Sequence, residues 1–136
     1  TPRRAVVGWD SGRMAMLLAV LEARCGLSFS NAEVYLNVAG GYRLSDPAAD
    51  LAVAAALVSA LGDKPLPNDA VWFGEVSLAG EIRPVAHASI RQRESAKLGF
   101  AKAFGPATTR ETAGNGARYT ELALLPNLVD RVLGQA

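Results

Sequence analysis

Hydrophobic and polar positions recur along the chain with helical and strand-like spacing, which predicts interleaved helices and strands. After Asp10 or Ser11, either of which can cap a helix, apolar residues fall on one helical face at the spacing i, i+3, i+4, i+7. They are Met14, Leu17, Leu18 and Leu21. Gly26 is expected to end this helix because glycine tolerates a left-handed backbone. Residues 5–9, before the helix, and 32–38, after it, are predicted to be strands.

A second helix is predicted to begin at Pro47 and to close at Gly62. Ser45 or Asp46 can cap it, and Pro47 suits the first helical position, where no amide donor is needed. Residues 48–61 are almost entirely apolar and contain seven alanines. A helix that is apolar nearly all round is expected in the centre of the molecule, buried by its neighbours.

The second half of the chain alternates between short strands and helices. Strands are predicted over 71–78, 81–85 and 101–104, helices over 89–98 and 126–133, and a polar loop over 108–117. The first two strands flank Ala79-Gly80 and are expected to form a hairpin. The predicted fold class is therefore α+β, a mixed β-sheet with packed helices, in a single domain that covers residues 1–136.

Composition is that of an ordinary globular protein and excludes several classes. Of the 136 residues, 50% are hydrophobic and 20% are charged, and the net charge is only +1, less basic than most DNA-binding modules. No apolar run reaches the roughly 18 residues that a membrane span requires. One cysteine, Cys25, and no signal peptide indicate a reducing, cytoplasmic setting. The opening Thr1-Pro2-Arg3-Arg4 resembles a linker, so the chain is expected to be a fragment.

Tests for common chemistry are negative. His87 is the only histidine and Cys25 the only cysteine. Neither has nearby carboxylates in the sequence that would indicate a metal site. No serine lies in a nucleophile-elbow pattern, and no phosphate-binding GxxxxGK[ST] loop occurs. The sequence therefore predicts no metal, no bound cofactor and no ATP hydrolysis for this chain.

Six basic residues allow two interpretations. They are Arg3, Arg4, Arg43, Arg91, Arg93 and Lys97. In one interpretation they belong to a solvated surface, which the nearly neutral composition favours. In the other they are DNA-binding residues that contact phosphates and add salt-dependent affinity that is independent of sequence.

Three blocks of sequence carry a family resemblance. They are residues 40–52 (GGYRLSDPAADLA), 73–85 (FGEVSLAGEIRPV) and 94–100 (ESAKLGF). In this order, and with the opening residues 1–5, they resemble the C-terminal Lon-protease-like domain of the bacterial RadA (Sms) family of DNA repair proteins. The resemblance implies a Lon proteolytic-domain-like fold (ribosomal protein S5 domain 2-like).

The resemblance also implies a larger parent protein and its partners. Members of the family carry an N-terminal zinc-binding motif and a RecA-like ATPase core, so ATP and zinc are expected in those domains and not in this chain. Expected partners are copies of the chain in a homohexamer, the ATPase core, DNA that is single-stranded or branched, and the RecA recombinase. The implied function is DNA recombination and repair of DNA damage, through branch migration of recombination intermediates, in the cytoplasm.

The protease chemistry of the Lon fold is expected to be lost. Lon proteases use a serine in a Pro-Ser-Ala-Gly motif and a lysine from a Lys-x-Lys segment. By the resemblance, Ala48 stands at the nucleophile position and Ser89 and Arg91 stand at the two lysine positions. A methyl group cannot attack a carbonyl, and an arginine stays protonated, so neither half of the dyad is present.

Alternatives remain for this cleft. An active Ser-Lys peptidase of the Lon class needs a relocated pair such as Ser45 with Lys97, although Ser45 is explained as a helix cap. A small-molecule kinase domain needs a glycine-rich ATP loop, which the sequence lacks. The expected active-site cleft could also hold an anion between Arg43, Arg91 and the helix start. The negative charges of two aspartates at the helix start would oppose such binding. These are Asp46 and Asp50.

Overall fold

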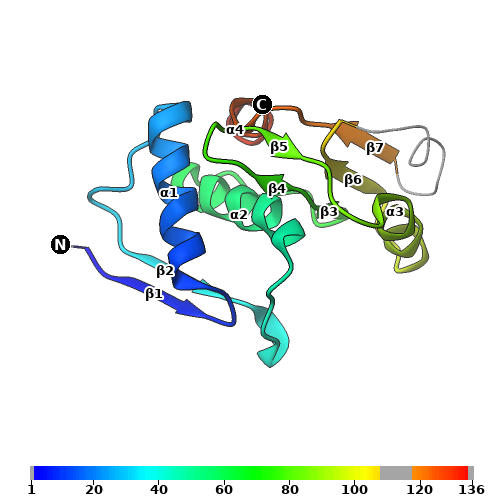
Figure 1. Ribbon diagram of the computed structural model, residues 1–136, viewed down its shortest axis with the longest axis horizontal. Coiled ribbons are helices and arrows are strands. Elements are labelled where there is room, and N and C mark those ends of the chain that lie inside the picture. The colour runs from blue at the N-terminus through cyan, green and yellow to red at the C-terminus, as the bar shows by residue number, and fades with distance from the viewer. Residues whose placement is uncertain (1, 108–117, 135–136) are drawn as a thin grey trace.

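The computed structural model describes residues 2–107 and 118–134, an α+β arrangement of four α-helices and three small β-sheets (Figure 1). The α+β class predicted from the sequence is confirmed. A single mixed sheet is not: each sheet is either purely parallel or purely antiparallel. None of the helices in the described ranges is both long enough and apolar enough to cross a bilayer.

The N-terminal unit is a parallel pair of strands joined by a helix. Strands β1 (Arg4–Val7) and β2 (Val34–Asn37) pair in register, and α1 (Ser11–Cys25) connects them. The Asp10 carboxylate accepts the backbone N–H of Arg13 at 2.8 Å, which satisfies one of the free donors at the helix start. Gly26 ends α1 with φ +70°. Both predicted ends of this helix are confirmed.

The central helix begins with a short 3₁₀ turn. Pro47–Ala49 form this turn, and α2 (Asp50–Gly62) continues from it. Asp46, not Ser45, caps the turn, because its carboxylate accepts the backbone N–H of Ala48 at 2.9 Å. The predicted closure at Gly62 is wrong by one residue: Gly62 is the last helical residue, and Asp63 takes the left-handed conformation with φ +52°.

The predicted strand over 71–78 is two strands that belong to different sheets. Strand β3 (Ala70–Trp72) pairs in parallel with β6 (Lys102–Gly105), and β4 (Glu75–Val76) pairs antiparallel with β5 (Ile82–Arg83), which confirms the hairpin. The chain leaves the first sheet at Gly74, whose backbone bonds to the start of α2. Its N–H donates to the Ala48 carbonyl at 2.9 Å, and its carbonyl accepts the Leu51 N–H at 3.0 Å.

Strand β7 (Arg118–Glu121), on the outer side of β6, was not predicted. The predicted loop over 108–117 lies outside the described residues. Helix α3 (Ala88–Lys97) begins after His87, whose φ of +63° is left-handed, so the histidine lies at the entry to the helix. Helix α4 (Leu125–Leu133) completes the described fold.

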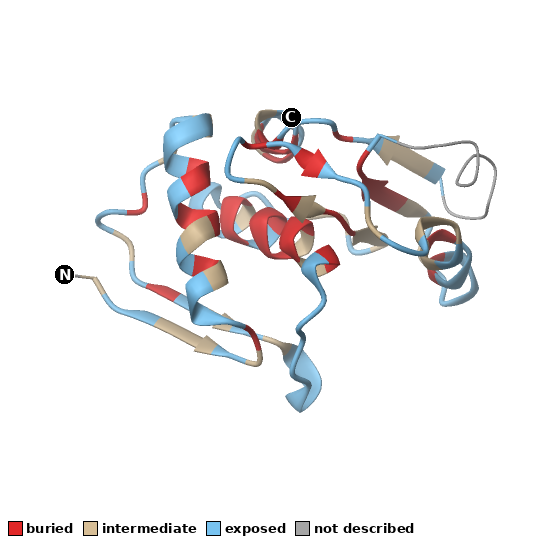
Figure 2. Ribbon diagram, in the orientation of Figure 1, coloured by how far each residue is buried: buried red, intermediate tan, exposed pale blue. Residues whose placement is uncertain are grey.

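The hydrophobic core lies where α1, α2 and α4 meet (Figure 2). Seven residues of α2 are buried, and they include Leu51, Ala54, Ala55 and Val58 without exposed surface. This confirms the central position predicted for the alanine-rich helix. A smaller cluster, formed by Ala48, Phe73 and Ala103, lies between the start of α2 and α3.

Candidate functional site

The position expected for a catalytic nucleophile is closed to solvent. Ala48 is only 3% exposed and packs in the small cluster with Phe73 and Ala103. Its backbone carbonyl accepts the Gly74 N–H, and its own N–H donates to Asp46. The side chain is a methyl group among apolar neighbours, and it has no group that could attack a carbonyl.

Arg91, expected from the resemblance at a lysine position, lies beside the same helix start. In α3, the Arg91 guanidinium donates from Nη2 to Asp46 Oδ2 at 2.8 Å and from Nε to the Ala86 carbonyl at 2.9 Å. The Asp46 carboxylate therefore lies between Ala48 and Arg91. The Ala48 N–H, and after it Arg91, hold the pKa of Asp46 below its usual value. Ser89, at the other lysine position, is half-buried in the first turn of α3.

This geometry opposes the binding of an anion at the start of α2. The start of α2 presents backbone donors, but the Asp46 carboxylate already accepts one of them and pairs with the nearest guanidinium. An incoming phosphate would have to displace this carboxylate against its negative charge. Arg43 lies in the exposed stretch 39–47. Among the described residues, the cleft therefore offers no free basic group at its centre to bind an anion.

A buried ion pair lies at the start of α2. Asp50 has no exposed surface, and Arg13 of α1 donates to it from both Nε and Nη2, the first at 2.5 Å. The Val76 N–H donates to Asp50 Oδ2 at 3.0 Å, and Glu75 lies 3.7 Å from the guanidinium. The hydrogen bond to Asp50 is the largest cause of the raised pKa of Arg13. The pair connects α1, α2 and β4.

The sequence analysis treated Asp50 only as a negative charge that opposes an anion and did not predict its pairing with Arg13. A signal was present: Asp50 is a charged residue at the beginning of an otherwise apolar segment. Charged groups in such segments need a partner when they are buried. The partner could not be chosen from sequence, because Arg13 lies 37 positions away.

The basic residues at the N-terminus differ in their freedom to bind a ligand. The Arg3 side chain is exposed. Arg4 instead holds the loop before β2, because its guanidinium donates to the carbonyl of Phe29 at 2.8 Å and also to that of Ala32. Arg4 therefore has a structural role that the sequence did not indicate.

The basic residues of α3 lie on one short helix, as expected. Arg93 and Lys97 are exposed, and Lys97 lies 3.6 Å from Glu94. The structure does not bring the six basic residues into one patch: β1 and α3 lie at opposite ends of the longest axis (Figure 1). DNA binding by these residues stays a prediction.

The remaining candidate groups are single residues in the described part of the chain. Among described residues, no three histidine, cysteine or acidic side chains lie close enough together to hold a metal ion. Cys25, at the end of α1, is half-buried, and burial raises the pKa of its thiol. A thiol of raised pKa is a poor nucleophile, so Cys25 is best explained as a small, partly buried apolar residue.

Comparison with known proteins adds two findings to this geometry. The family model described as "Subunit ChlI of Mg-chelatase" matches residues 12–109, more than half of the chain. The chain is also similar to several proteins named DNA repair protein RadA. That of Brucella abortus is 56% identical over 133 residues, which is 97% of this chain and 28% of that protein.

RadA proteins from other bacteria give the same result. The RadA of Rickettsia felis is 58% identical over 102 residues, 75% of this chain and 23% of that protein. The RadA of Escherichia coli is 51% identical over 106 residues, 78% of this chain and 23% of that protein. The chain thus spans about a quarter of the length of the relatives it matches. It belongs to the family of the bacterial DNA repair protein RadA, whose C-terminal region it matches.

Proposed function

We propose that this chain is a non-catalytic, Lon-like domain of a RadA-type DNA repair protein. Its role is to assemble the hexameric ring of the parent ATPase and to contribute DNA contact during branch migration of recombination intermediates. Its partners are copies of itself, the RecA-like ATPase core of the same protein, single-stranded or branched DNA, and the RecA recombinase. ATP and zinc bind to the other domains, and the parent protein acts in the cytoplasm.

One observation supports the loss of catalysis most directly. Ala48 is buried among apolar side chains, and Arg91 is paired with Asp46. A Ser-Lys dyad needs a hydroxyl next to an amine that can lose its proton, and a guanidinium cannot do so. This arrangement disfavours the alternative of an active Lon-class peptidase, as does the ion pair of Lys97 with Glu94.

Restoring the hydroxyl alone is expected to leave the protein inactive. The Ala48→Ser variant should hydrolyse casein no faster than the unmodified chain. The base nearest to the new hydroxyl is the Asp46 carboxylate, which is a weak base because the Ala48 N–H and Arg91 hold its pKa below the usual value. A fluorescent casein assay, with an active Lon protease as positive control, measures this. Casein hydrolysis by Ala48→Ser above the unmodified chain would contradict the proposal.

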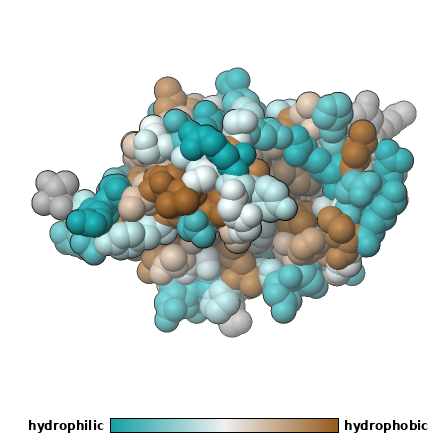
Figure 3. All heavy atoms as spheres, turned by 90° about the horizontal axis from the view of Figure 1, so that it is seen from below, coloured by the Kyte–Doolittle hydropathy of each residue, from teal (hydrophilic) through white to brown (hydrophobic). Residues whose placement is uncertain are grey.

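Assembly is supported by the N-terminal unit. A parallel sheet is ordinarily covered on both faces, yet the face of the β1–β2 pair that carries Val7 and Tyr35 is open to solvent. Large apolar side chains stay exposed near them: Val7 is 62%, Tyr35 63% and Tyr42 71% exposed. Figure 3, seen from below Figure 1, shows hydrophobic side chains scattered among hydrophilic ones on this face. Exposed aromatic residues are enriched in protein interfaces.

Light scattering over a range of concentration and salt tests the assembly role. A particle with six times the 14.2 kDa mass of the chain is the expected result at high concentration. A monomer under every condition would contradict ring assembly by this domain and leave DNA contact as its proposed role.

DNA contact through basic residues is tested by a triple variant. Changing Arg43, Arg91 and Arg93 to alanine in the full-length protein should weaken DNA binding and flatten its salt dependence, by about one unit of slope for each phosphate that is no longer neutralised. Fluorescence anisotropy at several salt concentrations measures both effects, with exposed Arg24→Gln as the single-charge control. Equal affinity and slope in the triple variant would return these residues to the solvated-surface interpretation.

A further inference from the structure

One face of the β3–β6–β7 sheet combines aromatic and basic side chains. Side chains at paired positions, and at every second position of a strand, lie on the same face. Trp72 pairs with Phe104, and Lys102 pairs with Arg118 of β7. Helix α3 packs on the opposite face, where its Ala88 lies in the small cluster. The aromatic and basic face is thus separate from the α3 residues discussed above.

The two aromatic rings are stacked and bordered by a cation. The ring centroids of Trp72 and Phe104 lie 4.1 Å apart with an interplanar angle of 11°. The Arg131 guanidinium, from α4, lies over the Phe104 ring with its Cζ 5.2 Å from the centroid. Phe104 is only 2% exposed, whereas Trp72 keeps partial access to solvent.

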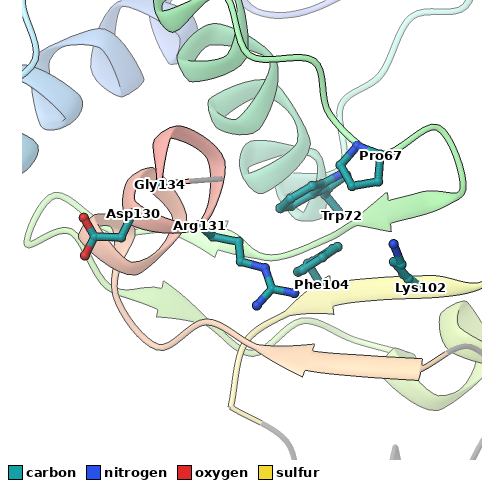
Figure 4. Close-up of a pocket in the computed structure, with 7 residues that line it drawn as sticks. All are labelled: Pro67, Trp72, Lys102, Phe104, Asp130, Arg131 and Gly134. Atoms are coloured by element: carbon teal, nitrogen blue, oxygen red, sulfur yellow. The ribbon is translucent and has the colours of Figure 1, made fainter. Parts of the chain in front are cut away.

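A surface cavity of about 350 Å³ opens beside these rings (Figure 4). Its lining residues are Pro67, Trp72, Lys102, Phe104, Asp130, Arg131 and Gly134. Its size falls within the range of small-molecule sites. Lys102 is loosely paired, with its Nζ 3.8 Å from the Asp69 carboxylate, so its charge stays available to a ligand.

This set of groups fits one kind of ligand better than others. Proteins bind single-stranded nucleic acid by stacking bases on aromatic rings while lysine and arginine contact the phosphates. Asp130 would repel a ligand that is only an anion, but its carboxylate can accept a hydrogen bond from the exocyclic amine of a base. An acidic peptide would satisfy the cations and leave the aromatic surface unused.

We propose that this cavity binds a nucleobase of single-stranded DNA against Trp72, with the flanking phosphates on Lys102 and Arg131. The site rests on the proposed DNA contact and gives it a location that the six basic residues considered from the sequence do not include. Arg118 extends the basic surface along the sheet, because it lies beside Lys102 in register. This arrangement lets the bound strand run across β6 and β7.

The chain offers a direct optical test, because it contains only two tryptophans. Trp9 is 4% exposed, so Trp72 is the residue whose fluorescence a bound base can quench. Titration with a labelled single-stranded oligonucleotide should quench tryptophan emission in parallel with the rise in anisotropy of the label. Trp9→Phe leaves Trp72 as the sole tryptophan. If that variant is unstable, the unmodified chain gives the same readout over the constant emission of the buried Trp9.

Two charge variants localise the binding. The double variant Lys102→Gln, Arg131→Gln should bind the oligonucleotide with about tenfold lower affinity, whereas Arg24→Gln should bind it with unchanged affinity. Inorganic polyphosphate, which has charge without bases, should compete poorly and should not quench Trp72. Circular dichroism confirms that each variant is folded.

The outcomes separate this site from the proposed function. DNA binding with no Trp72 quenching and no effect of the double variant would overturn the site and leave DNA contact elsewhere. Quenching and competition by polyphosphate equal to those of the oligonucleotide would overturn base recognition. The absence of any DNA binding by the chain would overturn both the site and the DNA-contact part of the proposed function.

Discussion

Arg13→Ala is expected to lower the free energy of unfolding by about 3 kcal/mol, because it leaves the Asp50 carboxylate buried without its cation. Asp50 has no exposed surface, and its remaining hydrogen bond in the described structure comes from the Val76 N–H. The value lies at the lower end of the range for a broken buried pair, since the Arg13 side chain is 29% exposed. Urea denaturation followed by circular dichroism measures it.

The control for this prediction replaces both charges. Arg13→Met combined with Asp50→Leu removes the pair without leaving an unpaired charge, so it should be much closer to the unmodified protein than Arg13→Ala. If Arg13→Ala costs less than about 1 kcal/mol, the pair is no more than a surface ion pair, and its assigned role in connecting α1, α2 and β4 is wrong.

Phe104→Ala is expected to destabilise the protein by about 3–5 kcal/mol, the usual cost of removing a buried aromatic side chain and leaving a cavity. Phe104 packs in the main core, stacks on Trp72 and lies under Arg131, so one substitution removes packing against both β3 and α4. Thermal and urea unfolding, both followed by circular dichroism, measure the loss of stability.

Leu98→Ala is the matched control, because Leu98 is apolar but 74% exposed. Its removal should change the unfolding free energy by no more than about 0.5 kcal/mol, as is usual at surface positions. A cost for Phe104→Ala similar to that of Leu98→Ala would mean that α4 does not pack on this sheet as described.

The helices could be predicted because the residues that signal them lie close together in the sequence. The periodic apolar positions of α1 and the cap at Asp10 concern residues within a few positions of each other. Because an apolar face can be stabilised only by burial, the uniformly apolar segment 48–61 could be placed in the centre of the fold. The β4–β5 hairpin could also be predicted, because its turn and its two strands are adjacent in sequence.

The errors lie where distant segments decide the local conformation. Residues 71–78 have the composition of one strand, yet Gly74 bonds to Ala48 and Leu51 and divides them between two sheets. Strand β7 is polar and exposed at several positions, and its pairing with β6 supplies the order that its own sequence does not indicate. Backbone hydrogen bonds between strands carry no periodic signal in either strand alone.

The candidate site divides in the same way. The residue types that the resemblance places at the dyad positions could be read from the sequence, and alanine and arginine cannot form a Ser-Lys dyad. The geometry of the site could not be read in this way: Asp46 lies between Ala48 and Arg91, and Arg4 holds a loop instead of facing a ligand. The aromatic and basic face around Trp72 was also invisible, since its members come from three strands and a helix.

The sequence by itself determined the four helices, the end of α1 at Gly26, the buried position of α2 and the residue types at the positions expected for the protease dyad. These depend on side-chain chemistry and on contacts between near neighbours. The tertiary structure alone decided the division into three sheets, the partner of Asp50 and the grouping of Trp72, Lys102 and Arg131. Those features depend on which distant groups meet when burial removes water, because only then do unpaired charges and backbone groups require a specific partner.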